Sequence, residues 1–417
     1  MICIENVTVP DGSTQNIVIE DTHIVSIGNK KDRSGTIIDG TKKLAIPGLV
    51  NTHTHLAMTL LRGYGDDLPL KEWLETKVWP AEKNLTKKAV YYGSLLGAIE
   101  MVKSGTTCFV DMYFFCNDIA RAVTDIGIRG YLGSGIFDFP SPESENSFET
   151  AIKFIREYKD KNELVVPIMA PHAMYTCSSE TFFKCLEAAK KYDLIFHTHV
   201  SETEGEVEEF EEQTGVRPVE FLYENKFLSE KFLAAHCVWL TQEEIDLFAE
   251  TGTKVSHNPV SNMKIAAGVM SLPEMVEAGV TVSLATDGAS SNNSLDMFEV
   301  MKICALLHKV TTGDPTIAPA EQVYEMATVH GAKSLGLNAG VIKEGYKADI
   351  VLVDYNRANT VPHHDFISNI VYSMHSGDVN TVVCNGNIIM EDRELVHVNE
   401  EDILEKAEEI AEDIVSD

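Results

Sequence analysis

The amino-acid sequence predicts an α/β protein: a closed (β/α)8 barrel of the TIM type, with a small β-sandwich domain formed by both chain ends. From residue 44 onward, short apolar or β-branched runs alternate with longer segments of helical period, and eight such runs can be counted. The two ends carry strand alternation and turn signals without helices between them. At 417 residues the chain exceeds the usual size of a single core, although a barrel can take most of it as one domain.

The barrel strands are predicted from β-branched and apolar runs that have the length of buried strands. These runs occupy residues 44–50, 106–112, 128–136, 164–171, 194–200, 232–238, 254–260 and 281–288. Helical stretches long enough for a crossover lie between them, among them residues 87–103, 180–191 and 241–250. We therefore expect a barrel domain over residues 44–344.

The chain ends are expected to pair into one small β domain, made of residues 1–43 and 345–395. The segments NIVIEDTHIVSIGN and VVCNGNIIMEDREL alternate apolar and polar residues around turn signals. This pairing would bring both ends together beside the barrel. The remaining segment, 396–417, is acidic, and a last helix is expected from about residue 400.

Composition and charge exclude several classes of protein. The chain has 34 Lys and Arg against 64 Asp and Glu, and its net charge of −30 would repel a nucleic-acid backbone. It has no apolar stretch able to span a bilayer, so we expect no membrane partner. The eight cysteines include no C-x-x-C pair and are expected to be free thiols. The first residues have neither a basic leader nor a cleavage site, so a cytoplasmic location is expected.

Polar side chains stand where most of the predicted barrel strands end, which is where barrel enzymes place their reactive groups. They are His53 and His55, His172, His199 followed by Glu202, His236, His257, and Asp287. Alternate residues of a strand project to one face, so His53 and His55 can present two nitrogens to one point. With His199 and Asp287 they could complete the shell of one divalent ion such as zinc or iron(II). A single buried histidine is more often a hydrogen-bonded core residue, but the coincidence at so many strand ends favours a metal site.

Such a metal site predicts hydrolytic chemistry. A metal ion with one open position lowers the pKa of a bound water to about 7. His236 and Asp287 would orient this water and take its proton, and Glu202 is placed to pass a proton to the substrate. The alternative role for Glu202 is that of a helix N-terminal acid, because SETEGEVEEF begins with a serine that could cap a helix.

Four motifs, of which the first and third are long, resemble the amidohydrolase superfamily and, within it, the deaminase branch that acts on methylthioadenosine and S-adenosylhomocysteine. They are PGLVNTHTHLAMTLLRGYGDDLPLKEWLETKVWPAE, HTHVSET, HNPVSNMKIAAGVMSLPEMVEAGVTVSLATDGASSNNSLDMFEVMK and GYKADIVLVD, and the resemblance covers nearly the whole chain. It implies attack on C6 of adenine, with loss of ammonia and an inosine-type product. The signature of the cysteine-ligated deaminases is absent.

The resemblance also implies roles for individual residues. By that similarity, the metal ligands are His53, His55, His199 and Asp287, Glu202 is the proton shuttle, Glu82 grips the ribose, and His172 contacts the substrate. One divalent ion per subunit is implied, preferably Zn²⁺ with Fe²⁺ or Mn²⁺ as alternatives, because the fourth strand ends without a bridging lysine. Relatives are commonly dimers or tetramers. Without the resemblance, Glu82 would be interpreted as a surface acid before a helix.

The sequence departs from the family pattern after the third strand. Relatives that act on S-adenosylhomocysteine can carry arginines there, whereas GYLGSGIFDFPSPESENS has none and is acidic. We therefore expect uncharged 5′ groups to be preferred, as in 5′-deoxyadenosine, methylthioadenosine and adenosine. Two other functions stay open: a deaminase or chlorohydrolase of guanine, cytosine or triazine-type rings, and a metal-free scaffold. The roles of His197 and His257 are undecided, and Trp73 and Trp79 either pack or wall the pocket.

Overall fold

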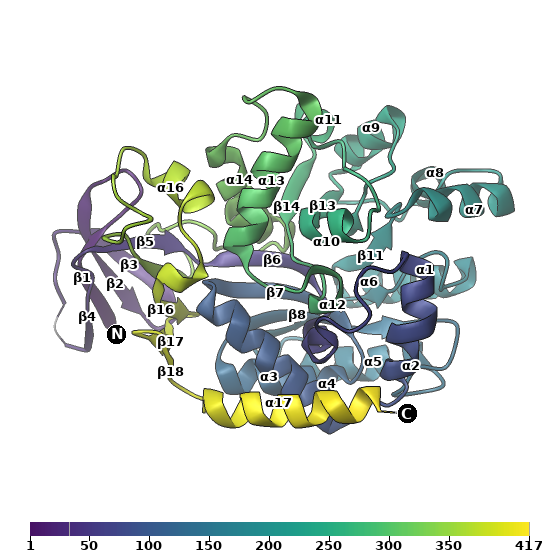
Figure 1. The fold of residues 1–417 in the computed structure, drawn as a ribbon, viewed down its shortest axis with the longest axis horizontal. Helices are drawn as coiled ribbons and strands as arrows, with labels where there is room; N and C mark the ends of the chain where they lie inside the picture. Colours follow the sequence, from purple (N-terminus) through teal and green to yellow (C-terminus); the bar gives the residue numbers. More distant parts are fainter. Residues whose placement is uncertain (33, 417) are drawn as a thin grey trace.

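The computed structural model describes residues 1–32 and 34–416, and within these residues both chain ends contribute to one nine-stranded sheet (Figure 1). Its strands are β1 (Ile2–Thr8), β2 (Thr14–Glu20), β3 (His23–Gly28), β4 (Thr36–Asp39), β5 (Lys43–Pro47), β15 (Ile350–Asp354), β16 (Val379–Cys384), β17 (Asn387–Glu391) and β18 (Glu394–Leu395). The two ends meet where β15 pairs antiparallel with β5. An apolar cluster that includes Ile4, Ile17 and Leu352 forms the core of this sheet.

The middle of the chain forms a barrel from two parallel half-barrels. One contains β6 (Leu49–Thr54), β7 (Thr106–Tyr113), β8 (Arg129–Ile136), β9 (Val165–Pro167) and β10 (Ala170–Pro171), and the other contains β11 (Phe196–Val200), β12 (Phe232–His236), β13 (Lys254–His257) and β14 (Thr281–Leu284). A bridge between Met169 and Phe196 joins them on one side. On the other side, the Asp287 amide donates to the His53 carbonyl at 3.0 Å, so the first and last strands close the ring.

Helices cover the barrel and its strand ends. They are η1 (Leu56–Leu61), α1 (Leu70–Trp73), η2 (Leu74–Val78), α2 (Trp79–Glu82), α3 (Lys87–Lys103), α4 (Cys116–Ile126), α5 (Ser147–Tyr158), α6 (Ser179–Tyr192), α7 (Glu204–Thr214), α8 (Pro218–Glu224), α9 (Gln242–Thr251), α10 (Pro259–Lys264), α11 (Leu272–Glu277), α12 (Ala289–Asn292), α13 (Met297–Thr312), α14 (Ala320–Ala327), α15 (Val329–Ser334), α16 (Phe366–Tyr372), η3 (Ser376–Asp378) and α17 (Glu400–Val415). In the part of the chain described, no helix has the length and apolar character needed to cross a membrane.

Three sequence expectations about the elements are corrected. The run at residues 44–50 is two strands, because β5 belongs to the end sheet and the barrel begins with β6. Gly48 separates them, and any side chain there would collide with Thr107, since a Cβ would lie 2.0 Å from the Thr107 Oγ1 atom. The strand expected at 164–171 is likewise two short strands, β9 and β10. The second end segment, expected to be free of helices, contains α16, which Asp365 caps and whose Ile370 and Val371 are buried.

The C-terminal helix α17 begins at Glu400, as predicted, and lies along α3 (Figure 1, yellow). Its side chains at Ile403, Ala407 and Ile410 recur at helical spacing and are buried. Asn399 caps the helix by accepting a hydrogen bond from the Asp402 amide. The chain end is therefore held to the barrel by an apolar stripe, while the acidic face stays in solvent.

A buried ion pair ties the barrel to the end sheet. Arg129, at the start of β8, forms a salt bridge with Asp349, the residue before β15, and both side chains are 2% exposed. Arg129 also donates to Asn385 at 2.9 Å, and the Asn385 amide donates to Asp349 at 2.6 Å. Every partner in this group is itself hydrogen-bonded, which is the condition under which a buried ion pair is tolerated.

We expect Asp349→Ala to lower the free energy of unfolding by about 3–5 kcal/mol, because the Arg129 guanidinium would stay buried without its counter-charge. Urea denaturation followed by circular dichroism measures this loss. Lys231→Ala is the matched control, since it breaks the exposed pair of Lys231 and Asp193 and should change stability little. Equal losses in the two variants would contradict the prediction.

Candidate active site

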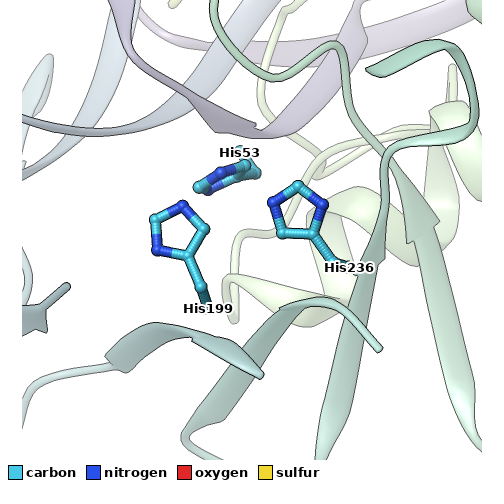
Figure 2. Close-up of side chains that lie close together, drawn as sticks. All are labelled: His53, His199 and His236. Carbon is cyan, nitrogen blue, oxygen red and sulfur yellow. The ribbon is translucent and has the colours of Figure 1, made fainter. Parts of the chain in front are cut away.

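Five predicted site residues converge at one end of the barrel. His53 comes from β6 and His55 directly follows it, His199 comes from β11, His236 from the end of β12, and Asp287 from the loop after β14. Figure 2 shows the rings of His53, His199 and His236 facing a common centre. The structure thus brings together all of the ligands expected from the sequence.

A β-bulge in β6 helps to aim the first ligand. The register of β6 against β7 shifts between Asn51 and Thr54, which places one extra residue in β6. The Thr52 hydroxyl bonds to the hydroxyls of Ser256 and Ser283 at 2.7 and 2.9 Å, inside the barrel. Because of the bulge, His53 also faces inward although it directly follows Thr52.

The ring nitrogens of these histidines are held in one tautomer by their neighbours. The Nδ1 atoms of His55 and His199 each lie 2.7 Å from a backbone carbonyl oxygen, that of Met112 and that of His172. A carbonyl can only accept, so each Nδ1 carries the proton and each Nε2 presents a lone pair. The Nδ1 atom of His236 bonds to the Asn262 side-chain oxygen at 2.8 Å, with the same result.

His53 is fixed by a two-step relay through His197. The Nδ1 atom of His197 donates to the Leu233 carbonyl at 2.8 Å, so its Nε2 atom must accept. The His53 Nδ1 atom lies 2.8 Å from this Nε2 and is therefore the donor. The buried Nε2 of His53 is left with a lone pair and no hydrogen-bond partner among the described residues. His197, whose role the sequence left open, thus orients the His53 ring through this hydrogen bond.

Asp287 is oriented by hydrogen bonds to both of its oxygens. Ser261 and Ser291 donate to Oδ2 at 2.7 and 2.9 Å, and the Gly288 amide donates to Oδ1 at 2.8 Å. The same Oδ1 atom lies 3.4 Å from the Nε2 atoms of both His53 and His55.

These contacts fit a tetrahedral metal ion. The Nε2 atoms of His55 and His199 are also 3.4 Å apart, and all the atoms that face one another are hydrogen-bond acceptors. Two ligands that bind zinc at about 2.0–2.1 Å are separated by about 3.3 Å in a tetrahedral shell. Burial lowers the pKa of His53 and His199, so these rings are neutral, as metal ligation requires. Repulsion between the acceptors is removed when a cation lies between them.

The backbone is strained at the same place. His236, Asp287 and Ser201 have φ values of 69°, 64° and 49°, in the left-handed region that residues other than glycine rarely adopt. All three follow or end a barrel strand. Strain of this kind is typical of functional sites, where it turns a side chain in a direction that the strand alone would not give.

Glu202 lies in the short segment between β11 and helix α7. Its backbone amide donates to the Glu206 carboxylate at 2.9 Å, and its Oε1 atom is 3.6 Å from the His236 Nδ1 atom. Helix α7 is capped by Thr203 rather than by Ser201, so the interpretation of Glu202 as a first-turn acid is wrong. Burial raises the pKa of Glu202 above its ordinary value.

A cavity of about 410 Å³ opens above the histidines. Its lining includes the candidate residues Glu82, His172, Glu202, His236 and Asp287, together with Trp73 and Trp79. Glu82 is buried and accepts a hydrogen bond from Tyr113 at 2.7 Å, so it is not the surface acid that its sequence context alone suggested. Burial raises the pKa of Glu82 to about 7, although the Tyr113 bond acts in the opposite direction.

Aromatic rings form part of the wall of this cavity. Phe137 lies 5.5 Å from Phe114, 5.1 Å from Phe139 and 4.8 Å from His172, measured between ring centroids. The His172 Nδ1 atom pairs with the Thr176 hydroxyl at 2.9 Å, and burial lowers the pKa of His172 to about 3. His172 is therefore a neutral ring whose other nitrogen is free to meet a ligand.

Sequence reasoning missed the side chains that hold the site from outside. Tyr113 directly follows a predicted strand, and Ser261, Asn262 and Ser291 lie inside the quoted motifs. The spacing of Tyr113, Ser261 and Asn262 predicts no contact with their partners, because each bonds to a residue of another segment. His257 does not join the site at all: Ser256 faces the barrel interior, so His257, the next residue of β13, points outward to His308 on α13.

Comparisons with known proteins agree with this geometry. Residues 44–389 match the amidohydrolase family. The chain is 45% identical to 5′-deoxyadenosine deaminase of Methanocaldococcus jannaschii and 44% identical to 5-methylthioadenosine/S-adenosylhomocysteine deaminase of Dictyoglomus turgidum, with 99% of each chain covered in both cases. The crystal structure of an adenosine deaminase from Xanthomonas campestris with bound zinc has a TM-score of 0.95 and 32% identity, covering 99% of this chain and 98% of that one. The predicted fold and resemblance are confirmed. The chain belongs to the amidohydrolase family.

Proposed function

We propose that this protein hydrolytically deaminates adenosine-type nucleosides to the inosine derivative and ammonia. The observation that carries the proposal is the set of acceptor atoms 3.4 Å apart on the floor of the cavity, between His53, His55, His199 and Asp287. Relatives more than 40% identical over nearly the whole chain are deaminases of such nucleosides, which supports the same substrate class here.

His53, His55, His199 and Asp287 would hold one divalent ion, for which zinc is the best match to the three-nitrogen, one-oxygen donor set. When bound, such an ion supplies a nucleophile at neutral pH, because it lowers the pKa of a coordinated water to about 7. A metal-free scaffold role is disfavoured, because it would leave several buried acceptors facing one another without a donor.

Three side chains around this centre would move protons. Burial raises the pKa of Glu202, which favours its protonated form, and this carboxyl would pass its proton to the ring nitrogen of the purine. Asp287 would stay ionised, because Ser261, Ser291 and the Gly288 amide donate hydrogen bonds to its carboxylate. His236 lies between the two carboxyl groups. Burial alone would lower the pKa of His236, but Glu202 and Asp287 raise it, which suits a group that orients a proton in transit.

Glu82 and His172 would bind the nucleoside. One Glu82 oxygen is taken by Tyr113, and the carboxylate keeps lone pairs that can accept from two adjacent ribose hydroxyls. The neutral His172 ring, stacked near Phe137, offers one nitrogen to the substrate. A buried ribose-reading carboxylate favours nucleosides over guanine, cytosine or triazine rings, which have no sugar to bind.

The 5′ group would lie against the aromatic wall. No arginine lines the cavity among the described residues, and its one lysine, Lys83, is exposed at the rim. Phe137, Phe139 and Trp79 offer apolar surface that an uncharged 5′-deoxy or 5′-methylthio group can bury. The charged tail of S-adenosylhomocysteine would lose hydration there without gaining a buried partner.

We further propose a homo-oligomer, dimer or tetramer, that acts in the cytoplasm. Leu306 and Val310 on α13 are 48% and 77% exposed and share one helical face, which supports an interface between copies.

The substrate range is tested by incubating purified, zinc-loaded protein with a panel of adenosine derivatives and following ammonia release. We expect kcat/KM for 5′-deoxyadenosine and methylthioadenosine to exceed that for S-adenosylhomocysteine by about tenfold or more, because the charged tail has no buried partner. Lys83→Ala serves as the control and should leave this ratio unchanged. A preference for S-adenosylhomocysteine would refute the 5′ assignment, and no ammonia from any nucleoside would refute the deaminase proposal itself.

The ribose contact is tested with Glu82→Gln. We expect kcat/KM for nucleosides to fall about 10- to 100-fold, because a charge-assisted hydrogen bond is lost. In the wild type, kcat/KM should rise with pH through about 7 as Glu82 ionises and becomes a better acceptor, and this dependence should be absent in the variant.

Tyr113→Phe is the matched control for this pH profile. The Tyr113 bond lowers the pKa of Glu82, so its removal should move the acid limb to higher pH while the carboxylate stays in place. Unchanged nucleoside turnover in Glu82→Gln would argue for a free ring as substrate.

The relay behind the metal is tested with His197→Phe, which removes the acceptor for the His53 Nδ1 proton. We expect zinc affinity, measured by competition with a chromophoric chelator, to fall about 10- to 100-fold. His197→Gln should recover part of the loss, because its amide oxygen can accept the same bond. Wild-type affinity in both variants would rule out an orienting role.

A further inference from the structure

A second group of metal-ligand side chains lies on the outer side of the barrel, between β13 and α13. It consists of His257, Cys304 and His308, and all three are at most 1% exposed. His257 points outward from β13, because its neighbour Ser256 faces the barrel interior. Cys304 and His308 are four residues apart in α13, so they lie on one face of that helix. A strand and a helix thus present nitrogen and sulfur atoms to one buried point.

The distances in this cluster are close to those of a metal site. One donor atom from each of the three residues lies within 4.8 Å of the others, and the Nε2 atoms of His257 and His308 are 3.0 Å apart. Two imidazoles on one tetrahedral zinc ion have nitrogens about 3.3 Å apart, so a shift of about 0.3 Å converts this contact into ligand spacing. The Cys304 sulfur, within 4.8 Å of one nitrogen of each ring, completes a set of three donors.

Hydrogen bonding within the protein does not satisfy these groups. A bond between the two imidazoles uses one nitrogen of each ring, and the buried Nδ1 atom of His257 has no partner among the described residues. Within the same part of the chain, the Cys304 thiol forms no hydrogen bond either, although the thiols of Cys177 and Cys384 each donate to a backbone carbonyl. Burial lowers the pKa of His257 and His308, so both rings are neutral and can offer lone pairs.

We propose that His257, Cys304 and His308 bind a second metal ion of the zinc class, held by one ring nitrogen from each histidine and by the Cys304 thiolate. The mixed nitrogen and sulfur donor set is typical of zinc and excludes the hard cations that need oxygen ligands. On binding, the thiol gives its proton to solvent. The ion has a structural role: it fastens α13 to β13, whose following segment carries Ser261 and Asn262, the partners of Asp287 and His236.

Cobalt substitution separates the two sites, because only the second has a sulfur ligand. Wild-type protein loaded with Co²⁺ should show a near-ultraviolet thiolate-to-cobalt charge-transfer band and bind about two ions per chain. Cys304→Ala and His308→Gln should lose the band, bind about one ion and melt at a lower temperature, yet keep deaminase activity. Asp287→Asn should keep the band and lose activity.

Each outcome decides the matter. One bound ion without a charge-transfer band in the wild type would show that His257 and His308 are only hydrogen-bonded to each other, with Cys304 as a small apolar residue. A band that survives Cys304→Ala would assign the sulfur to another cysteine and overturn the proposal equally. The wild-type spectrum gives this answer even where a variant fails to fold, and activity in the same sample reports on the catalytic centre independently.

Discussion

The buried acceptor atoms at the floor of the cavity impose the constraint on which the rest of the site depends. His53, His55 and His199 donate their Nδ1 protons to fixed partners, which leaves their Nε2 atoms with lone pairs. At 3.4 Å, the Nε2 atoms of His53 and His55 face the Asp287 carboxylate, and those of His55 and His199 face each other. Adding protons does not resolve the conflict, because burial lowers the pKa of His53 and His199. A cation at the centre satisfies every acceptor at once, and this explains why so much of the surrounding hydrogen bonding serves to orient these atoms.

In this fold, the contact that closes the barrel also brings site residues together. The amide of Asp287 donates to the carbonyl of His53, so the bond that joins the last strand to the first also sets two proposed ligands side by side. The β-bulge in β6 and the left-handed backbone at Asp287 and His236 then turn the side chains inward. A barrel tolerates such strain at its strand ends because the packed strands below hold the backbone in place.

The sequence predicts the features that depend on local periodicity and misses those that depend on closure. His53 and His55 could be paired in advance because strand residues alternate, and the crossover helix α3 begins and ends where its pattern does. The division of residues 44–50 at Gly48 could not be predicted, because the whole run is apolar and the break is set by contact with Thr107. Likewise, the outward direction of His257 follows from the register of β13. The buried position of Glu82, on α2, depends on its contact with Tyr113 of β7. Such facts arise only when distant segments meet.

The surroundings also give the carboxyl groups that share this cavity different tendencies to ionise. Asp287 accepts hydrogen bonds from two serine hydroxyls and a backbone amide, which stabilise its charge in spite of burial. Glu202 has one distant histidine partner, and its neighbour Glu206, whose pKa burial raises to about 7, offers no positive charge. The two side chains have the same chemistry, but their surroundings give one carboxylate that is stabilised as an anion and one carboxyl whose pKa burial raises. That pairing is what acid–base catalysis of a hydrolysis needs. Because the difference comes from hydrogen-bond donors rather than from residue type, the donors around Asp287 are as necessary to the proposed reaction as the two carboxyl groups themselves.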